Sequence, residues 1–164
     1  MVKRLLAQCV DALPSGVRKR LFVALGLSQR AMTLGVRIMV RNEAGHVLLV
    51  RHTYVPGWYL PGGAVERHET VQHAAAKELQ EECNIEVLDE PVLFHFYRNP
   101  RTSRFDHVAL FICSNWHQRE PKQPDHEIAE TGFFASDKLP DGTTEPTRNR
   151  IAEILDGRPV SDIW

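Results

Sequence analysis

The sequence lacks the cysteine and histidine patterns of disulfide-rich and zinc-binding proteins. Its three cysteines are widely spaced and include no CxxC pair, which argues against a disulfide framework. None of the eight histidines belongs to an HExxH motif, so tetrahedral zinc has no support. We therefore expect Cys9, Cys83 and Cys113 to be reduced thiols in a cytoplasmic protein.

Long apolar runs and a strong net charge are missing as well. No stretch approaches the roughly 18 consecutive apolar residues of a membrane-spanning helix. The apolar start of the chain is interrupted by Gln8 and Asp11, so we expect neither a signal peptide nor a membrane anchor. The formal net charge of −1 gives no electrostatic case for binding a nucleic-acid backbone, and a polyanionic ligand would need local cations or a metal ion.

Apolar residues are plentiful enough for one folded domain. They make up 43% of the 164 residues, and no internal repeat divides the chain. Hydrophobic spacing predicts helices at 2–12, 15–26, 70–83 and 145–155. It predicts strands at 33–41, 46–52, 85–88, 92–99, 105–115 and 130–134.

This order of elements predicts an α+β domain over residues 31–164, preceded by an N-terminal helical extension over residues 1–30. Turn residues at 42–45 and 99–101 predict two hairpins, the first joining strands 33–41 and 46–52. The basic residues 18–20 are interpreted as a solvated face, with contact to a phosphate or a membrane surface as the alternative.

Four glutamates surround a Gly-Gly turn and the helix at 70–83: Glu69, Glu78, Glu81 and Glu82. Because an α-helix turns by about 100° per residue, the last three project to one side. The neighbouring stripe is apolar and should face the core: Val71, Ala74, Ala75 and Leu79. The three carboxylates would then be partly desolvated and would repel one another. A hard divalent cation with oxygen ligands would compensate them, whereas the alternative is a plain solvated helix.

The segment from Gly63 to Ile85 closely resembles the signature of the Nudix hydrolases, which cleave nucleoside diphosphates linked to another group. The spacing is Gly63, five residues, Glu69, seven residues, Lys77-Glu78, then the Glu81-Glu82 pair. Two positions depart from the signature. Lys77 stands in place of Arg and loses the planar fork, and Asn84 stands in place of a Gly that caps the helix.

The resemblance implies a Nudix-type α/β/α sandwich with a mixed sheet over about residues 33–156. It implies that Mg²⁺ or Mn²⁺ is held by Glu78, Glu82 and Glu81, with the backbone carbonyl of Gly62 as a further ligand. By the same resemblance Glu69 and Lys77 support these ligands from behind. The alternative for that pair is a surface salt bridge of little energetic value.

The resemblance also implies a general base from a later loop, at a position that varies within the family. The loop after Trp116 offers four carboxylates: Glu120, Asp125, Glu127 and Glu130. Glu127 is our choice, because it directly precedes the strand that starts at Ile128 and could turn toward the metal. An ordinary acidic loop residue is the alternative.

Substrate contacts are predicted from the segments that flank the Gly-Gly turn. Trp58 or Tyr59 could stack on a nucleobase, with a place in the core as the alternative. Arg37, Arg51 and His52 could reach phosphates, but alternate strand positions point opposite ways, so not all can face one site.

These observations predict a metal-dependent hydrolase that splits a phosphoanhydride in a small nucleotide diphosphate substrate. The rival hypothesis is a catalytically silent Nudix-like module that binds a nucleotide and regulates a partner. The sequence does not select the leaving group, and it leaves the oligomeric state open, a homodimer included.

Overall fold

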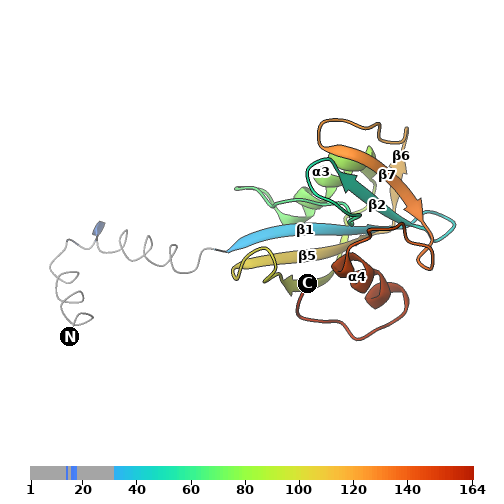
Figure 1. The fold of residues 1–164 in the computed structure, drawn as a ribbon. Coiled ribbons are helices and arrows are strands. Elements are labelled where there is room, and N and C mark those ends of the chain that lie inside the picture. Colours follow the sequence, from blue (N-terminus) through green and yellow to red (C-terminus); the bar gives the residue numbers. More distant parts are fainter. Residues whose placement is uncertain (1–13, 15, 18–31) are drawn as a thin grey trace. The chain divides into compact units, whose positions relative to one another are not determined.

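A computed structural model of the chain describes residues 14, 16–17 and 32–164, and Thr33–Trp164 forms one compact unit (Figure 1). The predicted helices at 2–12 and 15–26, with the basic residues 18–20, lie outside the described residues apart from 14, 16 and 17. The elements are β1 (Thr33–Val40), β2 (Val47–His52), α3 (Val71–Cys83), β3 (Ile85–Val87), β4 (Val92–Arg98), β5 (Asp106–Cys113), β6 (Trp116–Gln118), β7 (Ile128–Phe134) and α4 (Glu145–Leu155). None of the described helices meets the length and apolarity that a membrane span requires.

The strands pair in three sets, and the largest is a mixed sheet with the order β1-β5-β4. β1 runs parallel to β5, and β4 runs antiparallel to β5, which confirms the predicted hairpin of strands 92–99 and 105–115. β2 pairs with β7, and β3 pairs with β6, both antiparallel. The sequence did not anticipate β6 as a strand separate from β5.

The predicted hairpin of β1 and β2 is confirmed only at its turn, where Arg41 and Val47 form an antiparallel bridge and the Asn42 N–H donates to the carbonyl of His46 at 3.1 Å. The pairing does not continue along the two strands, because another segment lies between them. On the β1 side, the N–H groups of Val36 and Ile38 donate to the carbonyls of Gly63 and Pro61, at 2.8 and 2.9 Å. On the β2 side, Val50 and Tyr59 exchange two backbone hydrogen bonds of 2.9 Å. The Gly-Gly loop therefore occupies the edges that a β1–β2 hairpin would need.

Alternation along the strands produces two apolar cores, one on each side of the sheet. The α3-side core includes Val36, Ile38, Val40, Leu48, Val50, Ala109, Phe111, Ala74, Ala75 and Leu79. The α4-side core includes Met39, Val47, Leu49, Trp58, Leu60, Tyr97, Leu110 and Ile151. Helices α3 and α4 thus cover opposite faces, which is the predicted α/β/α arrangement (Figure 1).

Both ends of α3 are fixed by the residues that the sequence singles out. Thr70 is the N-cap, and its hydroxyl accepts the N–H of His73 at 3.2 Å. Asn84 ends the helix in the left-handed conformation, with φ 53° and ψ 33°, so Asn performs the expected cap in place of Gly. The apolar stripe of α3 is buried as predicted, which sets the rotation of the helix and therefore the direction of its glutamates.

Candidate active site

The Gly-Gly loop lies directly against the glutamates of α3. Gly62 has φ 138°, and a Cβ at this position would collide with the carbonyl oxygen of Val36. A Cβ on Gly63 would lie 2.5 to 2.8 Å from the carboxylate atoms of Glu78. Gly62 therefore requires glycine, because only a bare backbone can approach β1 this closely, whereas a side chain at Gly63 would displace the carboxylate of Glu78.

Glu82 is the most deeply buried acid of the cluster, with 5% of its side chain exposed. Its Oε2 accepts the N–H of Gly62 at 2.8 Å. Burial raises the pKa of Glu82 to about 8, although Arg37 and the Gly62 N–H act in the opposite direction. Burial also raises the pKa of Glu78, and the charge of Glu81 adds to that shift while Lys77 opposes it.

No lysine or arginine among residues 32–164 forms an ion pair with Glu78 or Glu82 within 4.0 Å. Two desolvated carboxylates and a nearby backbone loop thus carry negative charge without a matched cation of the protein. Carboxylate oxygens, backbone carbonyls and room for water are the donors that Mg²⁺ and Mn²⁺ accept. The residues present therefore fit a hard divalent cation.

The predicted ligands are not equivalent in the fold. Glu78 is half-buried and Glu82 is buried, whereas Glu81 is exposed to solvent. Glu127 is also exposed, yet its carboxylate lies within 4.8 Å of donor atoms of both Glu82 and His52. The backbone holds Glu127 there, because the N–H of Thr53 donates to its carbonyl at 2.9 Å and Asp125 accepts its N–H at 2.9 Å.

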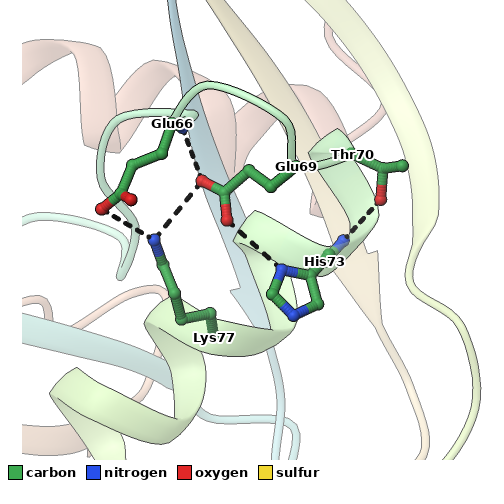
Figure 2. Close-up of polar contacts among 5 residues, drawn as sticks. All are labelled: Glu66, Glu69, Thr70, His73 and Lys77. Atoms are coloured by element: carbon green, nitrogen blue, oxygen red, sulfur yellow. Dashed lines mark hydrogen bonds and ion pairs between the residues drawn. The ribbon is translucent and has the colours of Figure 1, made fainter.

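Glu69 and Lys77 belong to a second network at the start of α3, in which one lysine pairs with two glutamates (Figure 2). Lys77 Nζ lies 3.2 Å from Glu66 and 3.3 Å from Glu69. The Glu66 N–H donates to Glu69, and this hydrogen bond, followed by those from His73 and Lys77, lowers the pKa of Glu69. Desolvation acts to lower the pKa of Lys77, but its two acidic partners raise it overall.

His52 lies beside Glu82 on the α3 side of the sheet. Its Nε2 is 3.6 Å from Glu82 Oε1, and only 4% of its side chain is exposed. Burial lowers the pKa of His52, and the positive charge of Arg37 lowers it further. The imidazole is therefore the uncharged form at neutral pH.

A cleft of about 490 Å³ lies next to the cluster and shares Arg37 and Gly63 with it. Arg37 Nη1 donates to the carbonyl of Leu60 at 2.8 Å, and its guanidinium lies 5.7 Å from the ring centre of Tyr59. Tyr59 lines the cleft as well. A cation and an aromatic ring thus lie between the acidic cluster and a space of ligand size.

Arg51 and Trp58 lie away from this arrangement. Trp58 is buried in the α4-side core, edge-on to Phe134 at 5.0 Å between ring centres. Arg51 pairs with Glu130 at 2.8 Å, and its guanidinium lies 5.7 Å from the ring of Trp58. Of the predicted substrate contacts, the structure brings Arg37 to the cluster and places Arg51 and Trp58 elsewhere.

Three residues of the cleft were not anticipated from the sequence: Asn99, Asp106 and Trp164. Asn99 Nδ2 donates to Asp106 at 2.8 Å, whereas its Oδ1 is buried without a hydrogen-bond partner in the described structure. Trp164 reaches the cleft because its N–H donates to the carbonyl of Arg98 at 2.9 Å. These three residues come from segments that are not adjacent in sequence, and no local sequence pattern predicts that they line one cleft.

Comparison with known proteins agrees with this geometry. The NUDIX domain profile matches residues 32–155. A MutT-like protein of Streptomyces ambofaciens is 29% identical over 126 residues, which cover 76% of this chain and 78% of that protein. The NAD-capped RNA hydrolase NudC of Vibrio vulnificus (strain CMCP6) is 32% identical over 105 residues, 63% of this chain but 38% of that protein. The chain thus spans little more than a third of that relative's length.

Solved structures show the same fold. The crystal structure of a NUDIX hydrolase from Nitrosomonas europaea matches with a TM-score of 0.65 and 25% identity, over 77% of this chain and 72% of that chain. The profile match extends over well more than half of the sequence. The chain therefore belongs to the Nudix hydrolase family.

Proposed function

We propose that this protein hydrolyses a phosphoanhydride bond in a nucleoside diphosphate linked to another group, with Mg²⁺ or Mn²⁺ as its cofactor. The observation that carries the proposal is the Glu78–Glu82 pair, which is desolvated, in contact with the Gly62-Gly63 backbone and without a lysine or arginine ion-pair partner among residues 32–164. A structural helix gains nothing from burying such a pair, because burying a carboxylate without a counter-charge is costly.

Each acidic residue has a separate role in this proposal. Glu78 and Glu82 would hold the cation, with the Gly62 carbonyl and the more exposed Glu81 completing the set. When bound, the cation polarises the phosphoryl oxygens and makes a water molecule more acidic. Glu69 and Lys77 keep the first turns of α3 and the preceding loop in place through their ion pair.

Glu127 is the proposed general base. Its carboxylate lies beside Glu82 but on an exposed loop, so it can reach a water that approaches from solvent. It would take one proton from that water while the oxygen forms a new bond to phosphorus and the bridging P–O bond breaks. Two phosphorylated products leave, and Arg37 would offset the charge that collects on the phosphate oxygens.

The substrate would lie with its phosphates at the α3 carboxylates and its nucleoside in the cleft of about 490 Å³. Tyr59 and Trp164 offer aromatic surfaces there, and the unpartnered Oδ1 of Asn99 would accept an N–H of the ligand. The named activity of NudC, hydrolysis of NAD-capped RNA, makes nucleotide-capped RNA ends one class to test beside small nucleotides. We place the reaction in the cytoplasm, in keeping with the free thiols of Cys83 and Cys113.

The rival hypothesis, a silent nucleotide-binding module, rests on the two departures from the Nudix signature. Asn84 adopts the left-handed cap that the signature glycine would supply. Lys77 contacts Glu69, which is the supporting role expected at that position. Neither departure therefore favours the silent module over the enzyme.

The experiment that tests the proposal is a panel of nucleoside diphosphate derivatives incubated with the protein and Mg²⁺ or Mn²⁺. We expect a nucleoside monophosphate product from at least one member, and no product in EDTA. Binding without product formation, for every substrate and both cations, would favour the silent module.

A further inference from the structure

The proposed metal site uses oxygen ligands only, and it leaves the buried His52 beside Glu82 and Glu127 without a role. This residue ends β2, where the register with β7 shifts between Arg51 and His52. The shift occurs where the loop that carries Glu127 joins β7. Backbone and side-chain bonds from Thr53 to the carbonyls of Glu127 and His126, at 2.9 and 2.7 Å, fix that loop beside the end of β2.

Donor atoms of His52, Glu82 and Glu127 all lie within 4.8 Å of one another. The gap between His52 Nε2 and Glu82 Oε1 is 3.6 Å, which is too long for a hydrogen bond. A cation about 2.1 Å from each of two ligands holds them about 3.0 Å apart at a right angle and about 3.4 Å apart at a tetrahedral angle. The observed gap therefore suits two ligands of one ion better than a direct contact.

The other ring nitrogen of His52 supports the same interpretation. Nδ1 is buried and has no hydrogen-bond partner among residues 32–164. A histidine kept only for core packing would normally pair at least one buried nitrogen, because an unsatisfied buried donor or acceptor costs about 1–3 kcal/mol. Two tyrosine rings instead pack beside the imidazole in tilted arrangements, with ring centres at 5.1 Å for Tyr54 and 5.8 Å for Tyr59.

We infer that His52 is a nitrogen ligand of the divalent cation, which it shares with Glu82 and Glu127. The inference rests on the metal site of the proposed function and adds to it a selectivity. Imidazole suits Ni²⁺ and Zn²⁺ better than Mg²⁺ and Mn²⁺, which prefer oxygen ligands. The site therefore favours a transition-metal ion over Mg²⁺, in contrast to a site built from carboxylates alone.

This ligand set also assigns a second role to Glu127. As a ligand it would hold its loop against β2 when the cation binds, and as the proposed base it would stay within reach of the attacking water. The exposed position of Glu127 is compatible with such an exchange, whereas the buried His52 and Glu82 stay fixed.

Pulsed electron paramagnetic resonance of Mn²⁺ bound to the full chain, with no nucleotide present, tests the inference directly. We expect a ¹⁴N coupling in the wild type that changes to a ¹⁵N pattern when the protein is labelled with ¹⁵N-histidine. His52→Gln should abolish the coupling, whereas His117→Gln, at an exposed position of β6, should retain it. If His52→Gln fails to fold, His52→Asn serves as the second variant, and a wild-type spectrum without ¹⁴N coupling overturns the inference by itself.

Calorimetric titration gives an independent measure. His52→Gln should weaken Ni²⁺ and Zn²⁺ binding by about tenfold or more and Mg²⁺ binding by less than about threefold. Equal losses for all three ions would mean that His52 only positions Glu82, and would overturn the inference. Bound Mn²⁺ without nitrogen coupling would overturn it too, yet leave the hydrolase intact. A wild type that binds no Mn²⁺ would contradict the metal site and the proposed function together.

Discussion

Two clusters of carboxylates lie along α3, one in the loop before the helix and one on its second half, and they differ in whether a lysine neutralises their charge. At the start of the helix, Glu66 and Glu69 share the ammonium of Lys77, and the pKa of Glu69 is lowered (Figure 2). Further along, Glu78 and Glu82 have no lysine or arginine partner within ion-pair distance in the described structure, and burial raises the pKa of both.

The first cluster stabilises the fold, whereas the second has negative charge that a bound cation would neutralise. The first supplies its own cation and so needs nothing from solution. The second is held together by the apolar face of α3 and by the Gly62 N–H, so the fold maintains it at a cost. Substitutions in the second cluster should therefore have larger effects than substitutions in the first.

The largest effect should come from Glu82→Gln. The amide keeps the size and the acceptor for the Gly62 N–H but loses the charge that holds a cation, so kcat should fall by at least about a hundredfold. The fold should remain intact, as checked by circular dichroism. The matched control is Glu90→Gln, which changes an exposed glutamate outside both clusters and should keep normal kcat. Near-normal hydrolysis by Glu82→Gln would show that the metal-site assignment is wrong.

A second prediction concerns stability in the presence of metal. A cation that binds only the folded state should stabilise the wild type by about 2.7 kcal/mol when free metal is a hundred times its dissociation constant. Replacing Glu78, Glu81 and Glu82 by Gln should raise the metal-free melting temperature and abolish the response to Mn²⁺. Glu81→Gln alone should leave the metal-free melting temperature nearly unchanged, because Glu81 is exposed and its charge is solvated. A wild-type melting curve that ignores millimolar Mn²⁺ would favour a solvated helix.

The pH dependence of metal-free stability should follow Glu82. Its pKa is about 8 in the folded state, against an ordinary value of 4.5, so the folded protein holds a proton that the unfolded chain has lost between these values. Unfolding free energy should therefore fall as pH rises from about 4.5 to about 8. Glu82→Gln should flatten this part of the curve. A Glu82→Gln profile as steep as that of the wild type would assign the slope to other groups.

The smallest effect on kcat should come from substitutions of Lys77, in the cluster with Glu66 and Glu69. Lys77→Arg keeps the charge and adds a forked donor for Glu66 and Glu69, so activity should stay equal or rise slightly. Lys77→Ala should lower kcat severalfold by loosening the loop before α3. Identical kcat in all three forms would mean that Lys77 is a plain surface residue.

The ends and the buried face of α3 could be predicted from sequence, because caps and helical spacing are local properties. Thr70, Asn84 and the apolar stripe behave as expected. The exposure of Glu81 could not be predicted in the same way. Whether the third carboxylate of a helical face touches the core depends on a rotation of a few tens of degrees, which packing against β1 and β2 sets.

The failures involve contacts between distant segments. The turn at 42–45 predicts a β1–β2 hairpin, but the pairing is decided by the segment Tyr59–Val65, which bonds to both strands. The sequence leaves Trp58 and Tyr59 as equal candidates for stacking, and in the structure Tyr59 lines the cleft while Trp58 is buried in the α4-side core. Both faces of the sheet carry an apolar core, so alternation cannot tell which face of this segment turns to the ligand.

The most direct test of the account is hydrolysis measured with the wild type and Glu82→Gln side by side. Both would be incubated with the same nucleoside diphosphate derivatives, in Mn²⁺, in Mg²⁺ and in EDTA, with release of nucleoside monophosphate as the readout. The account predicts product only from the wild type and only with a divalent cation. Product formation in EDTA, or equal rates from the two proteins, would contradict a metal centre built on the uncompensated carboxylates of α3.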